Sequence, residues 1–120
     1  MPTSRLARAL LIAGAVLLVA TAAFHSTGLS MVAGWLPGDR GQVLGLLWLT
    51  PVADWSIVGL LWIMAAVRGR ADWRAVVLIS AIIPAFAAIG LFWVVGAAHP
   101  GPFMLAAATL LALIGAWRLR

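Results

Sequence analysis

The chain has 120 residues, enough for one domain, and 65% of them are hydrophobic whereas only 9% are charged. A water-soluble domain has about a quarter charged residues, so the composition excludes an ordinary soluble surface and predicts one membrane domain over residues 1–120. The net charge of +5 comes from arginines at the ends of apolar segments. That arrangement is typical of membrane proteins and does not indicate nucleic-acid binding.

Four apolar segments follow one another along the chain, at about residues 9–35, 43–67, 75–98 and 103–117. A helix needs about 20 such residues to cross the hydrocarbon core of a lipid bilayer. The last segment is short, but the long side chains of Arg118 and Arg120 can extend it toward the interface. Short connections make neighbouring helices antiparallel, so we expect an all-α, up-down bundle of four transmembrane helices.

The distribution of arginines predicts the orientation of these spans. Only Arg40 follows the first span or the third, and the remaining arginines lie on the opposite side: Arg5, Arg8, Arg68, Arg70, Arg74, Arg118 and Arg120. The positive-inside rule therefore places both termini in the cytoplasm. A composition rich in Ala, Leu, Gly and Arg, without Lys or Tyr, is typical of a GC-rich bacterium, so we expect a multi-pass protein of the bacterial cytoplasmic (inner) membrane.

The first span has a second interpretation. Arg5 and Arg8, an apolar run and then Ala20-Thr21-Ala22 resemble a secretory signal with its cleavage site. The apolar run continues well beyond Ala22, which favours an uncleaved transmembrane helix.

An ionisable side chain, Asp54, lies near the middle of the second span, where a carboxyl costs about 2.5–3.5 kcal/mol. His25 lies at a similar distance from the turn between the first two spans, so an imidazole–carboxyl hydrogen bond forms if the two faces meet. Pro51, after Thr50, removes a backbone hydrogen bond close to Asp54. His25, Asp54, Thr50 and Pro51 form the candidate intramembrane polar site, with structural roles in helix packing as the alternative.

Trp48, Trp55 and Trp62 recur every seven residues and therefore share one face of the second span. Such a stripe is either the wall of a ligand or pigment pocket or a surface facing lipid or another subunit. We expect the second.

A candidate outer-surface site consists of His99, Asp39 and Arg40, all in or beside the turns on one side of the membrane. His99 and His25 are also the two imidazoles that a haem would need, but their expected depths differ. The chain has no Cys, and we predict no metal site and no cofactor.

Short motifs resemble those of small bacterial four-helix membrane proteins without an assigned activity. The matching residues are His25-Ser26-Thr27-Gly28, then Arg40 and Trp48, and finally His99-Pro100-Gly101. The resemblance implies the same four-span fold and brings no activity or site residues with it.

The leading hypothesis for function is a structural or accessory subunit that packs against a membrane-protein partner or a second copy of itself. Small residues and tryptophans on its helices would provide the contact surface. The alternative is a proton-linked carrier or ligand-binding bundle centred on His25 and Asp54. A membrane enzyme acting on lipid or quinone through His99, Asp39 and Arg40 is a third hypothesis.

Overall fold

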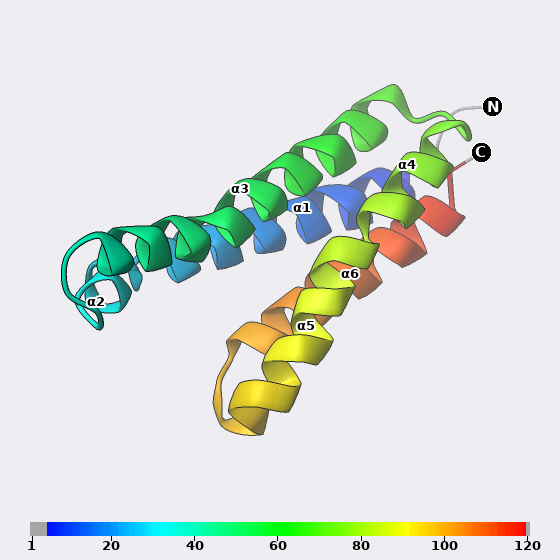
Figure 1. Ribbon diagram of the computed structural model, residues 1–120. Coiled ribbons are helices and arrows are strands. Elements are labelled where there is room, and N and C mark those ends of the chain that lie inside the picture. The colour runs from blue at the N-terminus through cyan, green and yellow to red at the C-terminus, as the bar shows by residue number, and fades with distance from the viewer. Residues whose placement is uncertain (1–4, 120) are drawn as a thin grey trace.

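The computed structural model describes residues 5–119 and is all-α (Figure 1). Its elements in chain order are α1 (Arg5–Ser26), α2 (Leu29–Ala33), α3 (Asp39–Arg68), α4 (Trp73–Ser80), α5 (Ile82–Val95), the short 3-10 helix η1 (Gly96–Ala98) and α6 (Gly101–Trp117).

Three helical segments are long and apolar enough to cross a membrane: Arg5–Ala33, Asp39–Arg68 and Trp73–Ala98. Gly101–Trp117 is apolar but shorter, with 17 residues. The expected apolar helices are therefore present in the described part of the chain.

Two of the predicted spans are interrupted. The first breaks at Thr27–Gly28, where the amides of Thr27 and Gly28 bond to carbonyls three residues earlier instead of four. The third is interrupted at Ala81, because Pro84 has no N–H for the carbonyl of Ser80. In contrast, α3 continues through Pro51 without interruption.

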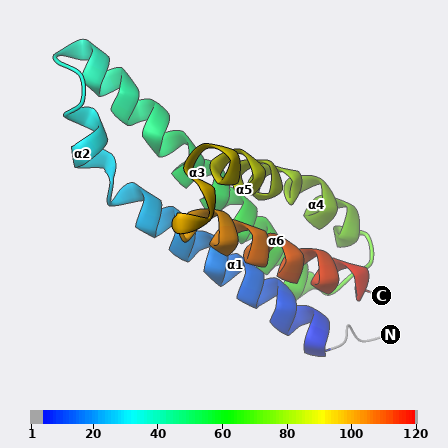
Figure 2. The same ribbon diagram turned by 90° about the horizontal axis from the view of Figure 1, so that it is seen from below.

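The helices form two hairpins that meet at one end and diverge at the other. Residues 5–68 form the first hairpin and residues 73–117 form the second. Both described ends of the chain and the turn at residues 69–72 lie at the joined end (Figures 1 and 2). The turns at residues 34–38 and 96–100 lie apart, at the open end (Figures 1 and 2).

The hairpins are held together where α1 packs on α6. Two glycines allow this close approach, one from each helix. A Cβ added at Gly14 would lie 2.9 Å from the carbonyl oxygen of Ala108, and one at Gly115 would lie 2.9 Å from Leu11 Cγ. Small residues at such contacts let helix backbones approach closely in membranes.

Polar side chains near the joined end are hydrogen-bonded within the protein. The indole N–H of Trp62 donates to Ser80 Oγ at 3.0 Å, which links α3 to α4. The Arg74 guanidinium donates to the carbonyls of Ala116, Trp117 and Leu119 and lies over the Trp117 ring. Arg74 therefore caps the carboxyl end of α6, whose last carbonyls have no partner within the helix.

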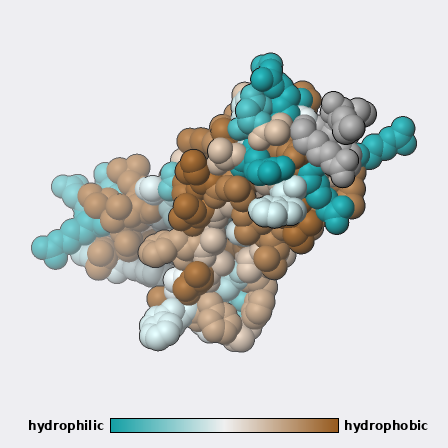
Figure 3. Space-filling view, turned by 90° about the vertical axis from the view of Figure 1, so that its right-hand side faces the viewer, coloured by the Kyte–Doolittle hydropathy of each residue, from teal (hydrophilic) through white to brown (hydrophobic). Residues whose placement is uncertain are grey.

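The surface is mainly apolar. In Figure 3, hydrophilic side chains gather toward the two ends of the molecule, and apolar side chains cover the face between them. Large exposed hydrophobic residues occur on every main helix, among them Val16, Leu46, Ile89 and Leu110. This is the surface expected of a protein that meets lipid over most of its area.

Candidate functional site

A reciprocal contact between His25 and Trp48 joins α1 to α3. Their rings stack with centroids 4.1 Å apart and planes 12° apart. The Trp48 indole N–H donates to the carbonyl of His25 at 2.8 Å, and His25 Nε2 donates to the carbonyl of Trp48 at 3.1 Å. Each residue therefore contributes its ring and its backbone to the other.

The break after α1 makes room for this contact. A Cβ added at Gly28 would lie 2.9 Å from Cζ2 of the Trp48 indole, so only glycine leaves the indole in its place. The carbonyl of His25 accepts from the amide of Gly28 as well as from the indole. Helix termination and indole docking therefore depend on the same short segment.

The tryptophan stripe of α3 faces inward. The edge of Trp55 meets the His25 ring, with centroids 5.3 Å apart and planes at 67°. Trp55 is only 3% exposed and Trp62 is fully buried. The expectation of a lipid-facing or subunit-facing stripe is therefore wrong for these two residues, because their side chains find partners inside the protein.

A cavity of about 550 Å³ lies between the two hairpins toward the open end, and His25 lines it. Trp48 and Trp55 form one wall from α3, and Leu91 and Val94 contribute from α5. The remaining lining comes from the end of α1, from α2 and from the turn before α6. Apolar and aromatic walls with a few polar groups are typical of ligand sites. We call this space the cleft.

His99 also lines the cleft, although we expected it at a different depth from His25. The backbone N–H of Gly101 donates to His99 Nδ1 at 3.1 Å, and the His99 ring lies 6.3 Å from the Phe24 ring. The second hairpin is shorter than the first, so its turn reaches only to the level of Phe24. Sequence distance from the turns therefore misjudged the relative depth.

The carboxyl of Asp54 does not meet His25. The two hydrogen bonds that join His25 to α3 are both with Trp48. The Asp54 side chain makes no hydrogen bond or ion pair with residues 5–119. Asp54 follows Pro51 by three residues and is half-buried. Thr50 Oγ1 donates to Leu46 in its own helix. The lining of the cleft includes none of Asp54, Pro51 and Thr50.

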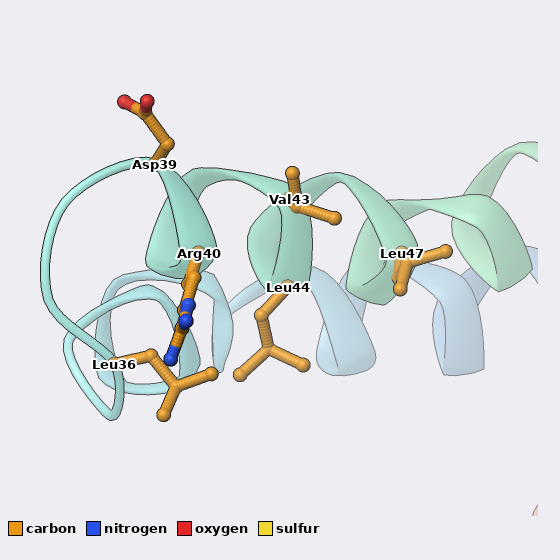
Figure 4. A pocket seen from close by; sticks show the side chains of 6 residues that line it. All are labelled: Leu36, Asp39, Arg40, Val43, Leu44 and Leu47. Atoms are coloured by element: carbon orange, nitrogen blue, oxygen red, sulfur yellow. The ribbon is translucent and has the colours of Figure 1, made fainter.

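The three residues of the candidate outer-surface site lie on different hairpins. Asp39 and Arg40 begin α3 and line a shallow surface hollow of about 380 Å³ with Leu36 and Val43. The carboxyl of Asp39 points away from the guanidinium of Arg40 (Figure 4). His99 belongs to the other hairpin, so the fold does not assemble the predicted site.

No group of three or more His, Cys, Asp or Glu residues that could hold a metal ion exists within residues 5–119. Comparisons of the chain with protein-family models, with curated proteins and with solved structures find no match. The resemblance to small bacterial four-helix proteins therefore stays a prediction.

Proposed function

We propose that the chain is a multi-pass protein of the bacterial cytoplasmic membrane, with four spans and both termini in the cytoplasm. The joined end of the described chain carries Arg5, Arg8, Arg68, Arg70, Arg74 and Arg118. The open end carries only Arg40, and Arg120 lies outside the described residues. This asymmetry supports the orientation.

The length of α6 is compatible with a fourth span. Its 17 residues extend about 26 Å at 1.5 Å per residue, slightly less than the roughly 30 Å hydrocarbon core. Arg118, exposed just after the helix, can reach the interface with its long side chain. Tilt of the longer first hairpin accommodates its extra length.

In this orientation the cleft lies near the outer boundary of the hydrocarbon core. His25 is 17 residues beyond Arg8, Trp48 is 20 residues before Arg68, and His99 is 19 residues before Arg118. These separations correspond to about 25–30 Å of helix. The three side chains therefore share one level, where a ligand can enter from the lipid and still meet polar groups.

The proposed function is binding of a lipid-soluble ligand in the cleft. The observation that carries it is the His25 imidazole, held in an aromatic contact at the wall of a cavity between two hairpins. A volume of about 550 Å³ is suited to a small molecule, since ligand pockets span about 300–1,000 Å³. The proposed site retains His25 from the ligand-binding bundle that the sequence predicted, but it does not include Asp54.

A cavity-filling variant tests this function. Val94 lines the cleft and Ile89 does not, although both are exposed residues of α5. Wild-type protein, Val94→Trp and Ile89→Trp are purified in mild detergent, and their solvent extracts are compared by mass spectrometry. We expect a stoichiometric small molecule in wild type and Ile89→Trp that Val94→Trp lacks. Identical extracts from all three proteins, holding only bulk lipid, would refute ligand binding in the cleft.

Asp54 supports a second candidate function, that of an accessory subunit or homo-oligomer. Its carboxyl is near the middle of a 30-residue apolar helix and has no partner in the described chain. A neighbouring membrane helix that supplies a donor would relieve the cost of placing the group there. Asp54→Leu should then dissociate a complex that is stable in mild detergent, whereas Ser56→Leu, on an exposed part of α3, should not. A monomeric wild-type protein would refute this candidate.

A further inference from the structure

We propose, resting on ligand binding in the cleft, that the ligand is a neutral, lipid-soluble aromatic alcohol of the phenol or quinol class. The two imidazoles that line the cleft carry their protons on defined ring nitrogens, and these positions determine what each can offer a ligand. One imidazole presents a hydrogen-bond acceptor and the other presents a donor.

His25 presents the acceptor. A backbone carbonyl can only accept a hydrogen bond, so the 3.1 Å contact between His25 Nε2 and the carbonyl of Trp48 places the proton on Nε2. In the neutral imidazole Nδ1 then carries a lone pair. Nδ1 has no hydrogen-bond partner among residues 5–119, so it is available to a hydroxyl group.

His99 presents the donor. The backbone N–H of Gly101 donates to His99 Nδ1 at 3.1 Å, so Nδ1 is unprotonated and the proton of the neutral ring is on Nε2. That N–H has no acceptor within the described residues. A ligand oxygen is the acceptor that would satisfy it.

A phenolic hydroxyl combines the two functions, because its hydrogen can bond to His25 Nδ1 and its oxygen can accept from His99 Nε2. The tryptophans of the wall, Trp48 and Trp55, suit a flat ring, and Leu91 and Val94 suit its apolar substituents. A hydrocarbon chain would leave His25 Nδ1 and His99 Nε2 without partners, which is unfavourable in an apolar site.

The lining also argues against a charged ligand. No Arg within residues 5–119 lines the cleft, and Arg40, at the open end, lines the separate hollow at the start of α3. A phosphate or carboxylate would therefore enter an apolar cavity without a cation to balance it, at high cost. No carboxylate of the described residues lines the cleft either, so a cationic amine has no counter-ion there.

The test compares a brominated alkylphenol with its methyl ether, which share the ring, the bromine and the alkyl chain and differ in the O–H. Bromine quenches tryptophan fluorescence on contact, so each probe is titrated into full-length protein in phosphatidylcholine nanodiscs. We expect saturable quenching with the phenol about five- to tenfold tighter than with the ether, as the loss of one good hydrogen bond implies.

Two variants test the donor. His99→Phe keeps an aromatic ring and removes both nitrogens. The phenol and the ether both lose the hydrogen bond that their oxygen accepts from His99, so both should bind at least twofold more weakly. The preference for the phenol, which depends on the acceptor of His25, should remain. His99→Asn can still accept from Gly101 and donate to the ligand, so it should bind both probes as tightly as wild type. Trp93→Phe, an exposed residue outside the cleft, controls for quenching by probe dissolved in the lipid.

The outcomes separate the two proposals. Equal saturable binding of phenol and ether would overturn the ligand class and leave ligand binding in the cleft intact. No saturable quenching by either probe, together with identical solvent extracts in the Val94→Trp experiment, would overturn both. Unchanged affinity of both probes for His99→Phe would overturn the role of His99.

Discussion

The joined and open ends of the molecule use their polar side chains in opposite ways. Near the joined end, the Trp62 indole, the Ser80 hydroxyl and the Arg74 guanidinium are bonded within the protein. Toward the open end, His25 and His99 each use one ring nitrogen and leave the other without a partner in the described chain. The comparison indicates that the joined end holds the hairpins together, whereas the open end leaves one nitrogen of each imidazole available to a ligand.

The packing of the hairpins follows the same division. Toward the joined end, α1 approaches α6 closely enough that glycines are required at the contact. At the other end, α5 leaves α3, and the cleft opens between them. We expect substitutions near the joined end to affect folding and substitutions around the cleft to affect binding.

The largest expected effect comes from Gly14→Leu. The added side chain would start 2.9 Å from the backbone oxygen of Ala108, which cannot move without displacing α6. We expect a loss of about 3 kcal/mol in the free energy of unfolding, at the upper end of the usual cost of overpacking. Unfolding in mixed micelles with increasing dodecyl sulfate, followed by tryptophan fluorescence, measures it.

Gly90→Leu is the matched control for this substitution. Gly90 is also a helical glycine, but a Cβ added there meets nothing within 4 Å. Its free energy of unfolding should stay within about 0.5 kcal/mol of wild type, as is usual for surface changes. If the two leucine variants unfold alike, close α1–α6 packing is not what joins the hairpins.

Much of the fold could be predicted from the sequence because long apolar segments and terminal arginines are strong, local signals. The all-α class and three helices suited to span a membrane follow from them. The break at Thr27–Gly28 was missed, although a Gly after Ser and Thr is a recognised sign of interruption. The interruption at Ala81 had its signal in Pro84.

The site was less predictable because it depends on which faces meet. Depth counting brought His25 to the level of the middle of α3 but could not say that its ring meets Trp48 and Trp55 instead of Asp54. The inclusion of His99 depends on the relative lengths of two hairpins. Neither quantity is written in a local motif, so the sequence indicated His25 and His99 without joining them.

The next largest effect is expected from Arg74→Gln. Arg74 bonds to three carbonyls at the end of α6, and hydrogen bonds to charged groups contribute about 1.5–3 kcal/mol. Because the side chain is partly exposed, we expect a loss of about 2 kcal/mol in the same unfolding experiment. Phenol binding in the cleft should be unchanged.

Arg70→Gln provides the control for loss of an arginine at the joined end. Arg70 pairs with Asp72 at 2.9 Å, but both side chains are exposed, at 72% and 56%. Such surface pairs contribute about 0–1 kcal/mol, so this variant should unfold nearly like wild type. An equal loss in both variants would mean that charge at this end, and not capping of α6, stabilises the protein.

The smallest effect on stability should come from Gly28→Ala, which acts on the site itself. Gly28 and Gly34 have nearly the same backbone angles, with φ of −78° and −79°, so alanine fits the backbone equally well at both. A Cβ at Gly34 would make ordinary contacts at 3.5 Å, whereas one at Gly28 would lie 2.9 Å from the Trp48 indole. The two variants therefore differ mainly in displacement of that indole.

Displacing the indole weakens an aromatic pair and a hydrogen bond, each contributing about 0.5–1.5 kcal/mol. Gly→Ala also stabilises by restricting the unfolded chain, by about 0.4–1 kcal/mol, at both positions. We therefore expect Gly28→Ala to be about 1 kcal/mol less stable than Gly34→Ala. It should also lose the preference for the phenol, because the His25 ring no longer stacks on the indole that holds its Nε2 against the backbone carbonyl of Trp48. If Gly28→Ala is less stable than Gly34→Ala and still prefers the phenol, the His25–Trp48 contact contributes to stability alone. The assignment of folding to the joined end and of binding to the open end would then be wrong.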